Sequence, residues 1–489
     1  MHFSLIKSLV IGLAALIPAQ ATFVVRCGSR LYDQRSDPIA QPGRVSHHVH
    51  VLCGGNGFNF TMDFNDARQS VCSSCNIKQD MSAYWTPKLY YRAQDGSFQH
   101  VPLMGDDPHG ITGGMAIYYL HRPGPDNDPI APFPDGFRMV AGNPYKRTPG
   151  NDFNSKAISS LCIGSGPDGS NVQYAGFPNV TCPGGIRMQV TFPGCWNGRD
   201  NDAPDHVSHV AYPVDGNFDG GRCPSTHPVH IMTLFFEVGY QTNLFAGRWW
   251  DNDKQPFVLA TGDPSGYGMH GDFLNGWDPD TLQRAVRDCT DGNTGCPDQT
   301  FTYWTDAEQQ RCKLPLSVNE VVQGVLPSLP GCNPVSFDLP TAVKNNKNCA
   351  DKKVFNPSKD RPLPPISGWD YTGCGNDQPD SGRTFPDERW VDSGMTHQMC
   401  VEYCDRAEYT YAGIEYGNEC YCGNSLAGDR APVPGNWGNC LLPCPGDTTM
   451  ECGGYNAITM YKKGSTDAGS SKARRFADRI TDYLEYEVE

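Results

Sequence analysis

Polar and apolar residues alternate along short stretches of this chain, and this alternation predicts β-strands. Residues 187–192 read Arg-Met-Gln-Val-Thr-Phe, so every second side chain can face a core. Two apolar runs, at residues 115–120 and 231–238, are typical of buried strands. Loops rich in Gly, Pro, Asn and Asp lie between these stretches. The pattern therefore favours short strands joined by many turns.

Helical patterns are few. Residues 278–287 predict a helix, because Asp278 can cap it, a proline follows, and Leu282, Ala285 and Val286 are apolar. We therefore expect a mainly β protein. Its N-terminal domain is predicted to be a disulfide-rich β-sandwich or jelly-roll-like fold with long loops, followed by a small α+β cysteine-rich module.

Composition divides the chain into segments. Residues 333–367 are rich in Pro and Asn, which predicts an extended linker. We expect a β domain at residues 22–332, a cysteine-rich module at 368–462 and an acidic C-terminal tail at 463–489. Residues 1–21 are expected to be a signal peptide.

The signal peptide is predicted from three features. Lys7 precedes an apolar stretch at residues 9–17, and residues 19–21, Ala-Gln-Ala, are typical of a cleavage site. The apolar stretch is too short to cross a bilayer, and no other segment approaches that length. We expect a secreted protein, extracellular or in a cell wall, with no membrane span. Asn59 and Asn179 are candidate glycosylation sites, because Thr follows each two positions later.

Cysteine content and charge narrow the class further. The chain has 21 cysteines, which an oxidising compartment would pair into disulfides, with one thiol left over. The alternative role for these cysteines is zinc binding, and we favour disulfides over it. The net charge of −15 at pH 7 argues against nucleic-acid partners, since no basic patch could neutralise phosphates.

Histidines gather in a few short groups. A divalent metal is a candidate cofactor because three imidazoles often bind one ion. His48 and His50 would share one face of a strand, whereas His206 and His209 would share one face of a helical turn. With His227, these five are the candidate metal ligands. The alternative is that they hydrogen-bond loops.

Candidate catalytic residues follow from the chemistry of glycan cleavage. Hydrolysis of a glycosidic bond uses two carboxyl groups, and a lyase uses a base such as His or Tyr. The candidates are His270, Asp272, Asp80, Tyr84 and His209. Trp85 and Trp277 are candidate platforms for sugar rings, with core packing as the alternative.

The C-terminal module has a specific pattern. Eight cysteines lie between residues 374 and 452, within motifs such as Cys-Tyr-Cys-Gly-Asn at 420–424 and Cys-Pro-Gly-Asp at 444–447. Over residues 369–461 this pattern closely resembles a WSC domain. The resemblance implies binding to glycan, with wall β-glucan as the expected partner. Trp390, Tyr411 and Tyr416 are candidate carbohydrate-binding residues.

The N-terminal region has its own short motifs. They include Ser-His-His-Val-His at 46–50, Cys-Pro-Ser-Thr-His at 223–227 and Gly-Met-His-Gly-Asp-Phe-Leu-Asn-Gly-Trp-Asp at 268–278. Over residues 27–312 the chain is similar to the family catalogued as domain of unknown function nineteen-ninety-six, which is often joined to WSC domains in filamentous fungi. This resemblance implies no particular activity.

These observations favour a secreted fungal protein of the cell wall or of polysaccharide. It would bind glycan through its C-terminal module and carry a His- and Asp-lined carbohydrate-active site, of a hydrolase or a lyase, in its N-terminal domain. The alternatives are a non-catalytic wall or adhesion protein and an extracellular metal-binding protein.

Overall fold

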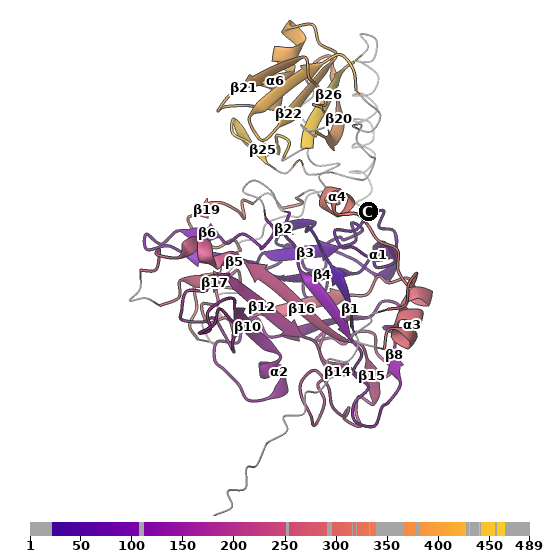
Figure 1. Cartoon of the computed structure of the whole chain (residues 1–489). Coiled ribbons are helices and arrows are strands. Elements are labelled where there is room, and N and C mark those ends of the chain that lie inside the picture. The colour runs from indigo at the N-terminus through magenta and orange to yellow at the C-terminus, as the bar shows by residue number, and fades with distance from the viewer. Residues whose placement is uncertain are drawn as a thin grey trace, which may run out of the picture.

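The computed structural model describes residues 22–106, 112–250, 254–290, 296–338, 366–377, 382–426, 430, 440 and 442–464, except residues 315, 319, 332, 455 and 456. The expected signal peptide lies outside the described residues, as do most of the expected linker and nearly all of the expected tail. The fold is mainly β, as predicted, and the N- and C-terminal parts each form their own sheets (Figure 1).

The largest sheet of the N-terminal domain has six strands in the order β1-β7-β16-β12-β10-β11, and all of its pairs are antiparallel. The strands are β1 (Thr22–Arg26), β7 (Ala116–Leu120), β16 (Thr233–Tyr240), β12 (Ile186–Thr191), β10 (Ile158–Cys162) and β11 (Val172–Tyr174). The strands predicted from the apolar and alternating patterns are β7, β12 and β16, so those predictions are confirmed.

A second antiparallel sheet has five strands in the order β2-β3-β4-β18-β9. The strands are β2 (Tyr32–Gln34), β3 (His50–Gly54), β4 (Ala83–Pro87), β18 (His270–Leu274) and β9 (Arg138–Gly142). One face packs against the six-stranded sheet, where the ring of Tyr84 lies 5.7 Å from that of Phe236. The domain is therefore a β-sandwich at its centre.

The other face of the five-stranded sheet is covered by loops and a short helix. Leu52, Trp85 and Leu274 form a second apolar cluster there with Phe58 and Ala67. Because side chains alternate along a strand, the inward positions of Tyr84 and Phe273 place Trp85 and Asp272 on this outer face. His50 shares the outer face, since its neighbour Val51 points into the central core.

Smaller elements complete the domain. One four-stranded sheet contains β17 (Phe257–Leu259), β5 (Leu89–Arg92), β6 (Phe98–His100) and β19 (Val325–Leu326), and another contains β14 (Val210–Ala211), β13 (Cys195–Trp196), β15 (Val229–Ile231) and β8 (Ile130–Ala131). The helices are α1 (Phe64–Arg68), α2 (Phe153–Lys156), η1 (Thr242–Phe245), α3 (Pro279–Asp288) and α4 (Asp306–Arg311). The helix predicted at 278–287 is α3, and the Asp278 carboxylate caps it by accepting from the backbone N–H of Thr281.

The described residues of the C-terminal module form a five-stranded antiparallel sheet and one helix. Its strands are β20 (Trp369–Asn376), β26 (Ala457–Lys463), β22 (Tyr411–Glu415), β23 (Glu419–Gly423) and β21 (Glu388–Val391), and α6 (His397–Arg406) packs on β22 and β23. A two-stranded sheet joins β24 (Pro443–Cys444) to β25 (Asp447–Glu451). No helix in the described part of the chain has the length and apolar character needed to cross a bilayer.

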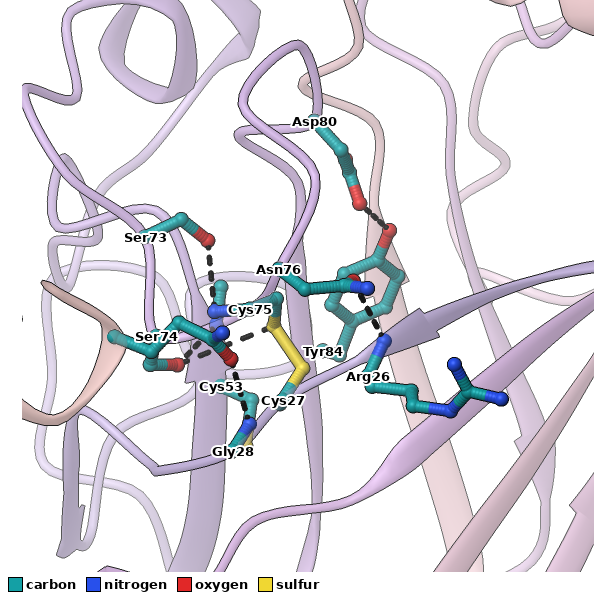
Figure 2. The surroundings of a disulfide bond; sticks show 12 residues. Arg26, Cys27, Gly28, Cys53, Ser73, Ser74, Cys75, Asn76, Asp80 and Tyr84 are labelled. Carbon is teal, nitrogen blue, oxygen red and sulfur yellow. Dashed lines mark hydrogen bonds between the residues drawn. A yellow bond between two sulfur atoms is a disulfide. The ribbon is translucent and has the colours of Figure 1, made fainter. Parts of the chain in front are cut away.

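Disulfides connect both parts internally, as the cysteine content predicted. In the described part of the N-terminal domain there are five: Cys27–Cys75, Cys72–Cys312, Cys162–Cys182, Cys195–Cys223 and Cys289–Cys296. The eight cysteines of the C-terminal module pair with one another as Cys374–Cys440, Cys400–Cys420, Cys404–Cys422 and Cys444–Cys452. Among the described cysteines, Cys53 alone is a free thiol, and it is buried close to Cys27–Cys75 (Figure 2).

Candidate functional site: a buried cluster of histidines and aspartates

Three histidines meet on the outer face of the five-stranded sheet. His50 begins β3 and His270 begins β18, while His48 lies in the segment that leads into β3. Ring nitrogens of the three residues lie within 4.8 Å of one another, and Nε2 of His48 is 3.0 Å from Nε2 of His270. All three side chains are buried. The structure thus unites residues that are 222 positions apart in the chain.

Backbone carbonyls orient two of these rings. Nδ1 of His50 lies 2.9 Å from the carbonyl oxygen of Ser36, and Nδ1 of His270 lies 3.0 Å from that of Gly268. A carbonyl oxygen can only accept, so Nδ1 carries the proton in both rings. In the neutral form each ring therefore has its lone pair on Nε2. Nε2 of His50 is buried and has no hydrogen-bond partner.

The environment favours the neutral form of these histidines. Burial lowers the pKa of His48 and of His50 well below the usual value, and the neighbouring imidazoles lower both further. Burial also lowers the pKa of His270 to about 4. The cluster therefore offers uncharged imidazoles near neutral pH.

Two carboxyl groups lie beside the histidines. Asp272 is two residues beyond His270 on the same face of β18, and Asp37 follows Ser36, the residue that accepts from His50. Burial raises the pKa of Asp37 to about 6, opposed by the backbone N–H groups of Ala40 and Ile39. Burial and the nearby charge of Asp37 raise the pKa of Asp272 well above its usual value. Oδ2 of Asp272 is buried without a hydrogen-bond partner.

The other histidines predicted as ligands have different contacts. His206 lies in a turn with a φ of 59°, and its Nδ1 is 2.8 Å from an Asp202 carboxylate oxygen. Nε2 of His209 donates to the carbonyl oxygen of Arg138, and Nε2 of the partly exposed His227 lies 3.0 Å from the carbonyl oxygen of Ser208. These three therefore do not join the cluster of His48, His50 and His270.

Comparison with known families agrees with this architecture. The model of the family described as "Domain of unknown function (DUF1996)" matches residues 37–277, and the WSC domain model matches residues 371–454. The chain carries a DUF1996 domain followed by a WSC domain. The DUF1996 match includes all five residues of the His and Asp cluster.

Similar curated proteins match over short stretches. A WSC domain-containing protein of Arthroderma benhamiae is 35% identical over 98 residues, which is 20% of this chain and 10% of that protein. Xylosyltransferase oxt of Drosophila pseudoobscura pseudoobscura is 36% identical over 66 residues, which is 14% of this chain and 7% of that enzyme. The chain thus spans about a tenth or less of the length of these two relatives.

A second group of predicted catalytic residues lies inside the DUF1996 sandwich. The hydroxyl of Tyr84 donates to Oδ2 of Asp80 at 2.5 Å and lies 2.7 Å from the hydroxyl of Tyr119 (Figure 2 shows the first contact). The indole N–H of Trp277 donates to the same Tyr119 oxygen at 2.8 Å. All four side chains are buried between the sheets, so this network stabilises the core of the sandwich.

The two tryptophans predicted as sugar platforms in the DUF1996 domain are fully buried. Trp85 packs edge-on against Phe58, and Trp277 contacts the rings of Phe23 and Tyr119. Their faces are covered by protein, so neither ring is available to stack on a sugar in this structure.

The WSC domain keeps its predicted aromatic residues partly exposed. Trp390 on β21 stacks on Tyr403 of α6, with ring centroids 5.0 Å apart and planes 27° apart. Tyr411 stacks on Phe385 at 5.5 Å, and Tyr416 lies in the turn between β22 and β23. Stacking on a partner holds the Trp390 ring in place while part of its surface still meets solvent.

The DUF1996 domain also has a hollow that the sequence did not indicate. Its volume is about 280 Å³. The lining includes three partly exposed aromatic rings and two lysines: Tyr174, Phe218, Tyr267, Lys146 and Lys156. Partly exposed rings around a shallow hollow are suited to contact the apolar faces of sugars.

Asp37 was not predicted as a site residue. It precedes Pro38, and an Asp-Pro pair ordinarily indicates a turn. Asp37 does form such a turn, since Oδ1 accepts from the backbone N–H groups of Ile39 and Ala40. Its closeness to Asp272 depends on the fold of the loop over the sheet, which no local pattern encodes. The glycosylation candidates Asn59 and Asn179 are both exposed.

Proposed function

We propose that this protein is secreted to the fungal cell wall and binds wall polysaccharide through its WSC domain. The observation that carries this proposal is the WSC match over residues 371–454 together with the supported, partly exposed ring of Trp390. A fungal WSC protein among the relatives supports an association with the cell wall. The nine disulfides among the described residues support an oxidising, extracellular location.

The chemistry of the WSC surface fits a neutral glycan. Trp390 and Tyr403 offer a flat apolar surface, and the Tyr403 hydroxyl donates to Oε1 of Glu388 at the edge of that surface. Aromatic faces pack on the C–H groups of a sugar ring, while carboxylates accept from its hydroxyls. We infer that wall β-glucan is the partner.

Retention of the full-length protein on insoluble polysaccharide tests this proposal. The Trp390→Ala variant is expected to bind β-glucan about tenfold more weakly, because it loses the stacking surface. Val391→Ala is the matched control, since Val391 is exposed on the same strand but points to the opposite face. Equal retention of both variants and the wild type on every wall polysaccharide would refute the role of this surface. A melting curve for each variant separates lost binding from lost folding.

Chemistry on polysaccharide by the DUF1996 domain is a second candidate function. It is favoured by the carboxyl groups of Asp37 and Asp272 beside three imidazoles, since acid and base groups together can cleave glycosidic bonds. The cluster is buried, so a substrate would reach it only if the covering loop moved. Incubation with a panel of wall and plant polysaccharides checks this. Released sugar from the wild type but not from Asp272→Asn would support a hydrolase or lyase, and no release from the wild type favours a non-catalytic wall protein.

A further inference from the structure

We propose that His48, His50 and His270 together bind one divalent transition-metal ion of the zinc class. Imidazole nitrogens suit zinc and its neighbours among the transition metals, whereas calcium and magnesium prefer oxygen. The site is separate from the WSC surface, and the inference does not depend on glycan binding.

The spacing of the nitrogens fits a shared ion. Two nitrogens bound to one tetrahedral zinc lie about 3.3 Å apart, given bonds of about 2.0–2.1 Å. Nε2 of His48 and Nε2 of His270 are 3.0 Å apart, and a nitrogen of His50 lies within 4.8 Å of both. Small rotations of the three rings would therefore bring all of them to one ion.

The backbone hydrogen bonds place an Nε2 lone pair on both His50 and His270. Ser36 and Gly268 accept from Nδ1 of these two rings, so Nε2 of His270 accepts from Nε2–H of His48, and Nε2 of His50 has no partner among the described residues. An ion bound by all three rings would replace the contact between His48 and His270. Metal-bound histidines in proteins usually donate their second N–H to a carbonyl or carboxylate in this way, which sets the tautomer and the ring orientation.

One buried atom has no other evident role. Nε2 of His50 is buried without a partner among the described residues, and an unsatisfied buried polar group destabilises the folded state. A bound cation would satisfy it. The Oδ2 atom of Asp272, which has no hydrogen-bond partner among the described residues, could accept from a metal-bound water.

The sheet keeps space open for the rings. His50 pairs with Pro87 of β4, and β18 runs along the other side of β4. On the side of β18 away from β4, His270 pairs with Gly142 of β9. Gly142 has a φ of +91°, and a Cβ added to it would lie 2.9 Å from the Cα of His270. Pro87 and Gly142 carry no long side chain, so the imidazoles of His50 and His270 can approach each other across β4.

Metal content of the full-length protein tests the inference. After removal of metal with a chelator, the wild type is expected to take up one equivalent of Zn²⁺ with a Kd below about 1 μM. Co²⁺ in its place should give the intense visible absorption of a tetrahedral nitrogen site. His50→Gln and His270→Gln are expected to bind at least about a hundredfold more weakly. His227→Gln is the matched control, because His227 is a partly exposed histidine outside the cluster.

The outcomes are decisive in either direction. Uptake that is lost in both cluster variants and kept in His227→Gln supports the site. No stoichiometric uptake by the folded wild type, or equal uptake by all four proteins, overturns it. If the cluster variants fail to fold, the Co²⁺ spectrum of the wild type decides, since an octahedral oxygen-type spectrum or none would also overturn the proposal.

Discussion

Asp33 is fully buried in the DUF1996 domain between two cationic side chains. Its carboxylate lies 2.7 Å from Nε of Arg30 and 2.5 Å from Nζ of Lys88. Burial raises the pKa of Asp33, but the charges of Arg30 and Lys88 outweigh burial and lower it to about 2. Arg30 also pairs with Asp106 at 2.6 Å. The buried charges thus compensate one another, as buried charges must in a stable core.

Asp80 forms no ion pair with the described residues, and the charge of Arg68 does not outweigh its burial, which predicts a pH dependence of stability. Burial raises its pKa from 3.8 to about 6, so the folded protein holds the proton more tightly than the unfolded chain. The free energy of unfolding should therefore fall as pH rises from about 4 to about 6, by up to about 3 kcal/mol from this residue. Denaturant titrations of the wild type and of Asp80→Asn at both pH values measure the effect.

In Asp80→Asn this contribution is absent, so the fall in unfolding free energy between pH 4 and pH 6 should be smaller than in the wild type. Other buried carboxyl groups titrate in both proteins. Their contribution is the same in each, so it is removed when the change in unfolding free energy with pH is compared between the two. Identical slopes would contradict the prediction. Asn can still accept from the backbone N–H of Ser82, as Asp80 does, which limits other changes.

At the scale of elements, β18 depends on a glycine between His270 and Asp272, its two residues in the candidate site. Gly271 faces the six-stranded sheet, where an added Cβ would lie 2.9 Å from the ring of Phe192 and 3.2 Å from that of Phe236. No side chain fits there without displacing packed aromatic rings. The glycine therefore lets β18 lie close to the opposite sheet while His270 and Asp272 point to the outer face.

Gly271→Ala is expected to lower the free energy of unfolding by about 1–3 kcal/mol, because it overpacks the core. Gly220→Ala is the control, since its added Cβ approaches only the flexible side chain of Arg122, at 3.2 Å. Chemical denaturation of both variants checks this. A loss for Gly271→Ala no larger than that for the control would show that the sheets can separate at little cost.

The sequence patterns predicted several strands and a helix, because the order of residue types within each short segment is enough to indicate its secondary structure. The alternation at 187–192 and the capping pattern at 278–287 match β12 and α3. The pair His206 and His209 differs, since a positive φ at His206 and two turns direct the rings to separate partners. Spacing alone relates two side chains only when the backbone between them is regular.

At the scale of the whole molecule, disulfides act separately on the two domains. Cys72–Cys312 links residues 240 positions apart and closes most of the DUF1996 domain into one loop. The cysteines of the WSC domain pair only with one another. Removal of Cys72–Cys312 should therefore affect one domain and leave the other unchanged.

The Cys72→Ala, Cys312→Ala double variant is expected to lose about 3–5 kcal/mol of DUF1996 stability, because the long loop no longer restricts the unfolded chain. Calorimetry should show an earlier unfolding transition for this domain and an unchanged one for the WSC domain. Loss of Cys289–Cys296, which closes a separation of only 7 residues, should cost less. A shift of both domain transitions would contradict this separation.

The sequence by itself determined the elements and the class: the strands at β7, β12 and β16, the helix α3, the disulfide-rich composition and the WSC pattern. Each of these depends on residue types close together in the chain. Only the tertiary structure decided that His48 and His50 join His270 rather than His206, His209 and His227, that Asp37 lies beside Asp272, and that Trp85 and Trp277 are covered. The physical reason is that pairing of β3, β4 and β18 and the path of the loop over them set which distant side chains meet, and this pairing depends on contacts across the whole domain.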